Sequence, residues 1–175
     1  MESAAKRIAH GTPPIGQSGS GDAARQERTF EAKLVGVRRL MLATDLSSAS
    51  ERAADEAIRV AVESGAELVV LSVVDPGRLR LPGGLFLRRV DQERARIEAD
   101  VQKLVRRARQ AGARATFLVW EGDPAEAILA AAESEQIDAI VLGSHGRGLL
   151  GRLVLGSISG AVSEQATCQV LVVAA

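Results

Sequence analysis

Five glycines and three basic side chains, one of them a histidine, lie in GSHGRGLLGRLVLGS, residues 143–157, directly after an apolar run. Gly143 and Gly146 remove side chains where that run ends, so backbone amides can approach a ligand closely. Nine residues separate Gly146 from Gly156, which with Ser157 begins a predicted helix whose first amides and dipole favour an anion. The spacing is therefore suited to binding a phosphate.

Polar side chains in the same stretch add to this chemistry. Ser157 and Ser159 supply hydroxyl donors. Arg147 can pair with a phosphate or stay solvated, and His145 favours a hydrogen bond that orders the loop over proton transfer. These residues alone support two interpretations equally: two amide clusters that hold a ribose and a phosphate chain, or a glycine-rich connection followed by an ordinary helix cap.

Two widespread phosphate-binding motifs do not fit. Residues 146–151, GRGLLG, match G-x-G-x-x-G, but the dinucleotide motif belongs after the first strand and opens a helix directly, whereas this one follows the fourth predicted strand. A P-loop requires a Gly-Lys pair, which the sequence lacks, and Lys103 is the only lysine after residue 33. Nicotinamide dinucleotide binding and lysine-centred phosphotransfer are both disfavoured.

The composition excludes further classes. The formal net charge is zero, so no overall field attracts nucleic acid or an anionic membrane. Aromatic residues are 2% of the chain, with no tyrosine, which argues against binding single strands by base stacking. Cys168 is the only cysteine and is expected to be a thiol without chemistry. We expect no nucleic-acid partner.

Residues 1–36 differ from the rest of the chain. The stretch HGTPPIGQSGSGDAARQ is rich in Gly, Pro and Ser and has no apolar periodicity, so residues 1–36 are predicted to be a disordered extension. No apolar segment follows the first basic pair, as a secretory signal would require, and no run approaches the roughly 20 apolar residues of a membrane span. We expect a cytoplasmic protein that does not bind membranes.

From residue 37 onward, short apolar runs alternate with amphipathic segments. The strands are predicted at 39–43, 68–74, 115–120, 137–142 and 170–173, and the helices at 48–64, 91–111, from 124 and 157–165. Strict alternation with apolar, β-branched strands is typical of a doubly wound α/β fold with one open parallel sheet. Ligands bind such sheets beyond the carboxyl ends of the strands, which selects the loops at Thr44-Asp45, Val74-Asp75 and from Gly143.

Local signals predict the helix ends. Ser48 and Glu51 fit a capping box at the first helix, and Gly65 fits a left-handed end. Asp123 followed by Pro124 fits a capped start of the third helix.

Three further stretches complete a family pattern. ATDLS follows the first strand, and VLGSHGRG and VLGSISGAV carry the spacing G-x2-G-x9-G-[ST]. Over residues 37–175 the chain resembles the nucleotide-binding subgroup of the universal stress protein family. The resemblance implies one universal stress protein domain, an adenine nucleotide alpha hydrolase-like sheet of order 3-2-1-4-5, and a dimer. It also implies ATP or a related adenine nucleotide as ligand, with Mg²⁺ as its companion ion.

The resemblance assigns roles to individual residues. Asp45 would contact the ribose or adenosine, although its position also fits a helix cap, and the Val73 backbone would meet the adenine edge, although Val73 also fits the sheet core. The implied nucleotide-binding residues are Ala43, Thr44, Asp45, Val73, Leu142, Gly143, His145, Gly146, Arg147, Gly156, Ser157, Ile158 and Ser159.

The expected function is an ATP-binding regulatory protein of the stress response. Asp45 is the one carboxylate placed at the loops and is committed to the nucleoside, while Asp75 belongs to an Asp-Pro turn, so efficient hydrolysis is not indicated. We assign no catalytic residue and no metal ligand. A slow Mg²⁺-dependent ATPase and a nucleotide-free dimeric scaffold remain the alternatives.

Two segments are candidates for partner binding. The last strand, residues 169–173, would be a bare apolar edge, and pairing across a two-fold axis would cover it in a homodimer. Residues 76–90 carry Arg78, Arg80, Arg88 and Arg89 and fit either a variable loop or a contact with another protein or a membrane surface. Protein partners other than a second copy are expected but not identified.

Overall fold

A computed structural model of the chain describes residues 36–78, 85–144 and 156–174. The predicted disorder of the extension concerns residues that, apart from Gly36, lie outside these ranges. The same holds for His145, Gly146 and Arg147 of the predicted site and for Arg80 of the basic segment.

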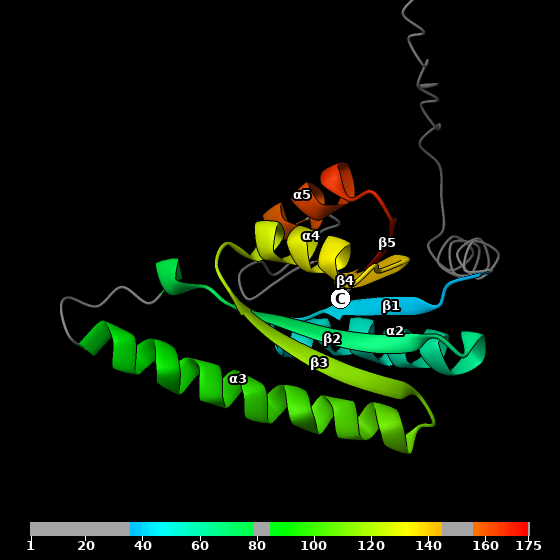
Figure 1. The fold of residues 1–175 in the computed structure, drawn as a ribbon, viewed down its shortest axis with the longest axis horizontal. Helices are drawn as coiled ribbons and strands as arrows, with labels where there is room; N and C mark the ends of the chain where they lie inside the picture. The colour runs from blue at the N-terminus through cyan, green and yellow to red at the C-terminus, as the bar shows by residue number, and fades with distance from the viewer. Residues whose placement is uncertain (1–35, 79–84, 145–155, 175) are drawn as a thin grey trace, which may run out of the picture. The chain divides into compact units, whose positions relative to one another are not determined.

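Five parallel strands form one sheet in the order β3-β2-β1-β4-β5 (Figure 1). The strands are β1 (Arg39–Ala43), β2 (Glu67–Val74), β3 (Arg114–Glu121), β4 (Ala139–Gly143) and β5 (Gln169–Val173). The predicted fold class and strand order are confirmed. The chain winds outward from β1 to β3 and then returns to start β4 beside β1, so the direction of winding reverses between these two strands.

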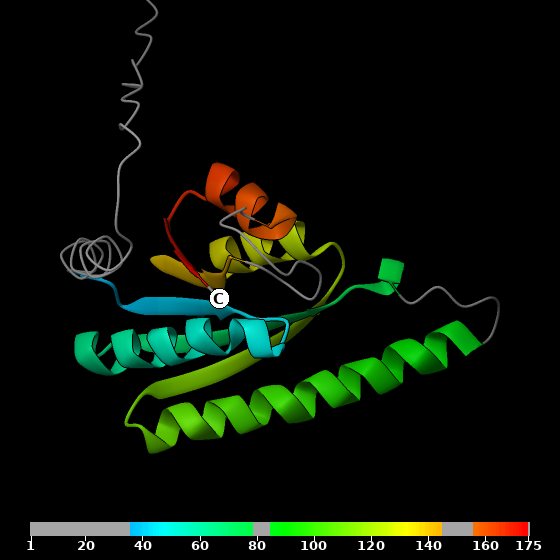
Figure 2. The same cartoon turned by 180° about the vertical axis from the view of Figure 1, so that it is seen from behind.

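The helices cover the two faces of the sheet in pairs (Figures 1 and 2). α2 (Glu51–Ser64) and α3 (Leu85–Gln110) lie on one face, and α4 (Pro124–Ser134) and α5 (Ser157–Gln165) lie on the other. A right-handed crossover places its helix on a face set by the direction of the step along the sheet. The steps toward β3 and toward β5 therefore put their helices on opposite faces.

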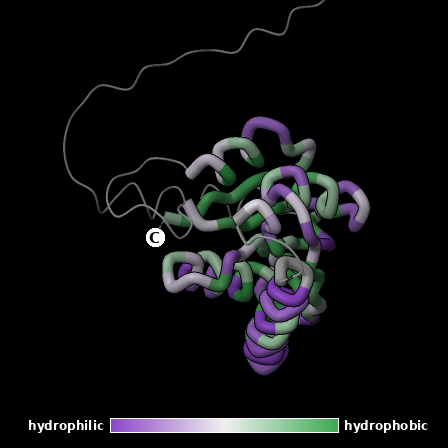
Figure 3. The backbone as a smooth tube through the Cα atoms, turned by 90° about the vertical axis from the view of Figure 1, so that its left-hand side faces the viewer, coloured by the Kyte–Doolittle hydropathy of each residue, from purple (hydrophilic) through white to green (hydrophobic). Residues whose placement is uncertain are grey.

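The core follows from the alternation of side chains along the strands. Leu40 and Leu42 of β1 are fully buried on the α2 side, while Met41 packs on the α4 side with Ile140 and with Val162 of α5. Figure 3 shows the apolar residues gathered along the strands and long hydrophilic stretches on α3. Among the described residues no helix combines the length and apolarity needed to cross a membrane.

The start of the first described helix differs from the prediction. A short 3₁₀ helix, η1 (Ser48–Ser50), precedes α2, and neither Ser47 nor Ser50 caps a helix through its side chain. The capping box of Ser48 with Glu51 is therefore wrong, because Ser48 already lies inside η1 and Glu51 is the first residue of α2. At the other end of α2, Gly65 adopts the predicted left-handed conformation with φ 70°.

The long helix α3 begins six residues earlier than expected. It starts at Leu85 rather than Asp91, after a short 3₁₀ helix η2 (Pro76–Arg78). Val90 is buried and lies seven residues before Ile97, so the apolar stripe of the helix extends into the segment predicted as a loop. The loop interpretation of residues 76–90 is thus wrong for 85–90, where Arg88 and Arg89 are exposed.

Candidate functional site

The carboxyl ends of β1 and β4 lie side by side at the point where the winding reverses. Ala43 is the register partner of Leu142, and both are buried. Thr44 donates its backbone amide to the carbonyl oxygen of Leu71 at 3.0 Å, which extends the pairing of β1 with β2 by one residue. The sheet thereby fixes Ala43, Thr44, Leu142 and Gly143 of the predicted site at one edge, where doubly wound folds bind ligands.

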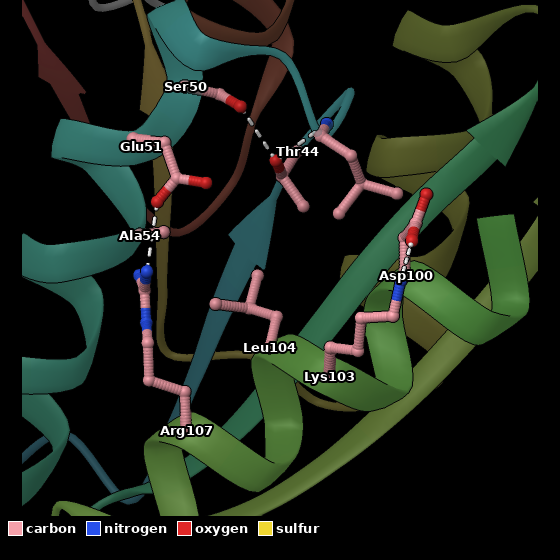
Figure 4. A pocket seen from close by; sticks show the side chains of 9 residues that line it. Thr44, Ser50, Glu51, Ala54, Asp100, Lys103, Leu104 and Arg107 are labelled. Carbon is pink, nitrogen blue, oxygen red and sulfur yellow. Dashed lines mark hydrogen bonds and ion pairs between the residues drawn. The ribbon is translucent and has the colours of Figure 1, made fainter.

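A ring of hydrogen bonds shapes the loop after β1, and Figure 4 draws the bond between Thr44 and Ser50. The Leu46 amide donates to Thr44 Oγ1 at 3.0 Å, and Thr44 Oγ1 lies 3.0 Å from Ser50 Oγ. Ser50 Oγ donates to the Ser47 carbonyl at 2.8 Å. A hydroxyl has one proton to donate, so Thr44 must be the donor to Ser50, and each hydroxyl then donates once and accepts once.

Asp45 is held inside this loop by Ser47. The amide of Ser47 donates to Asp45 Oδ1 at 3.0 Å, and Ser47 Oγ donates to the same oxygen at 2.6 Å. A carboxylate that accepts the amide two residues later forms an Asx turn. Leu46, between them, has φ 58°, in the left-handed region that a leucine rarely adopts. Asp45 is therefore positioned ahead of η1 rather than as the cap of α2.

Ser144, at the end of β4, is hydrogen-bonded to both β5 and the residue that begins α5. The Ser144 amide donates to the Val173 carbonyl of β5, and the Ser144 carbonyl accepts from the Gly156 amide, both at 2.8 Å. The buried hydroxyl of Ser159 lies 3.0 Å from the Gly156 carbonyl oxygen and 3.3 Å from the Ser144 carbonyl oxygen. The Gly156 amide and the Ser159 hydroxyl are thus hydrogen-bonded to backbone carbonyl groups where the end of β4 meets the start of α5.

The start of α5 is suited to an anion. Gly156 is its N-cap, with φ −60° and ψ 156°, and its carbonyl accepts the first helical bond, from the Gly160 amide at 2.8 Å. The amides of Ser157, Ile158 and Ser159 therefore have no partner within the helix. No acidic residue lies in the first turn of α5, so nothing there opposes the attraction of the helix dipole for a negative charge.

Val73 lies one strand farther along the sheet. It is the register partner of Trp120 on β3, and both pack, partly buried, against the core on the α4 side together with Ile158. The Val73 side chain thus belongs to the sheet core, which was one of the two interpretations of this residue. The role of its backbone stays a prediction.

A hollow of about 360 Å³ lies on the other face of the sheet, between the loop after β1, α2 and α3 (Figure 4). Thr44 and Leu46 form part of its wall. The charged lining groups pair with opposite charges: Lys103 with Asp100 at 2.8 Å, and Arg107 with Glu51 at 2.9 Å. Because its charges are matched and exposed, this hollow has no preference for an ion of either sign.

The described residues contain no cluster of side chains that could hold a metal ion, and their one thiol is not activated. Among residues 36–78, 85–144 and 156–174, no three His, Cys, Asp or Glu side chains are grouped to hold a metal ion. Cys168 is half-buried just before β5, and burial raises the pKa of its thiol, which keeps the sulfur protonated.

The loop after β1 also contains residues that the sequence analysis did not identify. Ser47 and Ser50 make the bonds that set its shape. The available signal was the spacing Asp45-x-Ser47, which fits an Asx turn. The ring through Ser50 had no such local signal, because it depends on how η1 folds back over Thr44.

Comparison with known proteins agrees with this geometry. The universal stress protein family matches residues 36–174. A universal stress protein of Thermus aquaticus is 36% identical over 137 residues, which cover 77% of this chain and 96% of the relative. The universal stress protein UspA of Lactobacillus plantarum, a solved structure, superposes with a TM-score of 0.72 at 26% identity, covering 78% of this chain and 97% of that one.

Several similar structures contain adenine nucleotides. A universal stress protein in complex with cAMP is 27% identical, with a TM-score of 0.60, and the match covers 79% of this chain and 97% of that one. Two more distant structures share the fold: an Archaeoglobus fulgidus complex with dAMP (22% identity, TM-score 0.60, 77% and 96% covered) and an Arabidopsis thaliana complex with AMP (19%, 0.58, 78% and 91%). The family match over nearly all described residues, together with the sheet order, establishes that this chain belongs to the universal stress protein family.

Proposed function

We propose that this chain is a regulatory protein of the stress response that binds ATP at the carboxyl edge of its sheet. The observation that carries the proposal is the meeting of three elements there: the loop of Asp45 after β1, the end of β4 at Gly143, and the amide-rich start of α5. Adjacent strands at a reversal of winding leave a crevice that a nucleotide can occupy.

The phosphates would lie at the start of α5. The amides of Ser157, Ile158 and Ser159 supply donors, and the helix dipole adds an attraction for negative charge. Gly156 brings no side chain to this point, so the phosphate chain can approach the backbone. The family resemblance adds His145, Gly146 and Arg147 to the residues expected to bind the nucleotide, with Mg²⁺ accompanying the phosphates.

The nucleoside would lie toward β1 and β2. The Asp45 carboxylate, held by Ser47, accepts hydrogen bonds, which suits the hydroxyls of a ribose. The Val73 backbone at the end of β2 would meet the adenine edge. The similar complexes with cAMP, dAMP and AMP support an adenine nucleotide, and the resemblance to the nucleotide-binding subgroup of the family is the reason to propose ATP.

The test is calorimetric titration of the purified protein with ATP, ADP, AMP and cAMP, repeated with Gly156→Asp. The backbone of Gly156 lies in the extended region that any residue adopts, and aspartate is a favoured N-cap, so the helix should keep its start. The added carboxylate would occupy the free amides and repel a phosphate. Gly156→Asn has nearly the same size without the charge and separates the two effects.

We expect ATP to bind the wild type more tightly than the other three nucleotides, and Gly156→Asp to weaken ATP at least tenfold more than Gly156→Asn does. Equal binding of ATP by wild type and Gly156→Asp would mean that no phosphate lies at α5. No heat from any of the four nucleotides would favour the nucleotide-free scaffold instead.

What the nucleotide would regulate is the pairing of two copies of this chain, so that the protein acts in the cytoplasm as a homodimer. β5 ends the sheet, and its residues from Val170 to Val173 are only half-buried, so a second copy pairing along Gln169–Val173 would cover them. Light scattering should give the mass of a dimer at micromolar concentration. A monomer there, with and without ATP, would contradict assembly through β5.

A further inference from the structure

We infer that Ser47 is a positioning residue that fixes the Asp45 carboxylate for the ribose hydroxyls, so that Ser47 sets the preference of this protein for ribonucleotides. The inference deepens the proposed function and rests on it. It starts from the distances within the loop after β1, in which Ser47 supplies two of the bonds that hold Asp45.

The first step is the fixed end of the loop. Thr44 is buried, and its amide is bonded to Leu71 of β2, so the sheet determines where Asp45 begins. From there, the left-handed backbone at Leu46 reverses the chain within two residues. That conformation is costly for a leucine and persists only where surrounding bonds hold it. The bond from the Leu46 amide to Thr44 Oγ1 is one of them.

The second step is the pair of hydrogen bonds by which Ser47 holds the Asp45 carboxylate. Both donors of Ser47 converge on Asp45 Oδ1, and the hydroxyl contact of 2.6 Å is in the range of a hydroxyl bonded to a charged oxygen. The carboxylate can turn about its last torsion, and each hydrogen bond to it limits this rotation. The hydroxyl restricts that rotation, because it approaches the same oxygen from a second atom.

The third step is that Ser47 is itself held. Its carbonyl accepts from the Ser50 amide at 3.0 Å and from the Ser50 hydroxyl at 2.8 Å. The Ser50 hydroxyl also accepts from Thr44, which closes the ring back to the end of β1. The position of the Ser47 hydroxyl is thus determined by the sheet through two routes, along the chain and across the ring.

The fourth step is the chemistry of the ligand. An ionised carboxylate only accepts hydrogen bonds. The ribose 2′ and 3′ hydroxyls are donors, whereas the ring nitrogens of adenine are acceptors and cannot pair with it. The 6-amino group of adenine is also a donor, but the adenine is proposed to lie one strand away, at the Val73 backbone, which leaves the sugar hydroxyls for Asp45. A carboxylate fixed at the mouth of the crevice therefore recognises the sugar, and its alignment matters only when the sugar carries hydroxyls.

The experiment compares ATP with 2′,3′-dideoxy-ATP by calorimetry on the full chain. Four proteins are titrated: wild type, Ser47→Ala, Ser47→Thr and Ser48→Ala. Ser48→Ala is the matched control, because Ser48 is exposed and adjacent in the same turn. Thermal unfolding of each variant verifies that it is folded at the temperature of titration.

We expect wild type to bind ATP about tenfold more tightly than the dideoxy analogue, since hydrogen bonds to a charged group are worth that much. Ser47→Ala should weaken ATP about fivefold or more and leave the analogue within twofold, so that the preference collapses. Ser47→Thr, which keeps the hydroxyl, should restore the preference, and Ser48→Ala should retain it.

Two outcomes would overturn the inference while leaving nucleotide binding intact. Equal weakening of both ligands by Ser47→Ala would mean that Ser47 only supports the loop, and an unchanged preference would mean that Asp45 does not need it. A wild type that binds neither ligand would instead remove the proposed function, and this inference with it.

Discussion

The amide of Gly156 donates to the carbonyl oxygen of Ser144 at 2.8 Å, across eleven intervening residues. This bond joins the end of β4 to the start of α5, so the amino end of the helix, where we propose that the phosphates bind, is tied directly to the sheet. Ser144 is in turn bonded to β5 through its amide. Through Ser144, the start of α5 is therefore connected to both β4 and β5.

Removing the Ser159 hydroxyl should weaken the contact between the end of β4 and the start of α5. The side chain is 2% exposed and its proton lies between the carbonyl oxygens of Gly156 and Ser144. Ser159→Ala should lower the free energy of unfolding by about 1 kcal/mol, the usual value of one such bond. Urea unfolding measures it, with Ser163→Ala, exposed on the same helix, as the control. Equal urea midpoints for the two variants would contradict a role of the Ser159 hydroxyl in holding the start of α5 against the end of β4.

The sequence predicts elements well where one local signal decides them. Asp123 before Pro124 gives the start of α4, and the structure shows the carboxylate accepting the amides of Ala125 and Glu126. The alternation of elements predicts the doubly wound parallel sheet, and the strand order, which the family resemblance implied, is confirmed. At the candidate site, the residues flanking β1, β4 and α5 could be predicted because glycine spacing and strand ends are local patterns, and their part in binding stays a prediction.

Features that depend on packing could not be predicted in the same way. The early start of α3 is decided by the burial of Val90, which needs the sheet beside it. The capping box at Ser48 is wrong because a 3₁₀ turn, η1, begins at Ser48 and α2 begins only at Glu51. The hydrogen bond from the Gly156 amide to the Ser144 carbonyl could not be predicted either. The sequence gives no sign that the end of β4 and the start of α5 meet.

Acid should destabilise the protein through Asp138, just before β4. Its carboxylate accepts the amides of Arg38 at 2.8 Å and Arg39 at 2.9 Å, and these bonds lower its pKa. A carboxyl whose pKa is lower in the folded state stabilises the fold fully above its unfolded pKa, about 3.9, and loses that effect as the pH falls through the folded value. The amino ends of β1 and β4 should therefore weaken below about pH 4.

Asp138→Asn measures this contribution. The difference in unfolding free energy between wild type and variant should be constant from about pH 7 to pH 5 and shrink toward pH 2. Chemical unfolding at a series of pH values gives the curve, and Asp91→Asn, at an exposed site on α3, is the control. A difference that does not change with pH would assign the effect of the substitution to shape rather than to charge.

The cap of α4 should contribute to stability without affecting ligand binding. Asp123 Oδ1 accepts from the Ala125 amide at 2.9 Å and the Glu126 amide at 3.2 Å. Asp123→Ala should lower the free energy of unfolding by about 1 kcal/mol. Glu133→Ala, exposed near the end of the same helix, should change it little. Because α4 begins after β3, away from the proposed phosphate site, both variants should bind ATP as the wild type does; weaker binding by Asp123→Ala would extend the site to this helix.

Glycine at position 136 should stabilise the protein. Gln136 follows α4 with φ 51°, is exposed, and donates its amide to the Glu133 carbonyl at 3.1 Å. A left-handed conformation costs a residue with a Cβ atom about 1–2 kcal/mol. Glycine avoids that cost but loses about 0.5–1 kcal/mol through the greater freedom of the unfolded chain. Gln136→Gly should therefore raise the free energy of unfolding by about 0.75 kcal/mol, the difference between the midpoints of the two ranges.

The same substitution at Gln102 should have the opposite sign. Gln102 is exposed in the interior of α3, where the backbone is helical and glycine costs about 1 kcal/mol. Thermal and urea unfolding of the two variants, side by side, compare one chemical change at two backbone conformations. If both variants were destabilised equally, the left-handed backbone at Gln136 would carry no strain, and the end of α4 would be held by its hydrogen bonds alone.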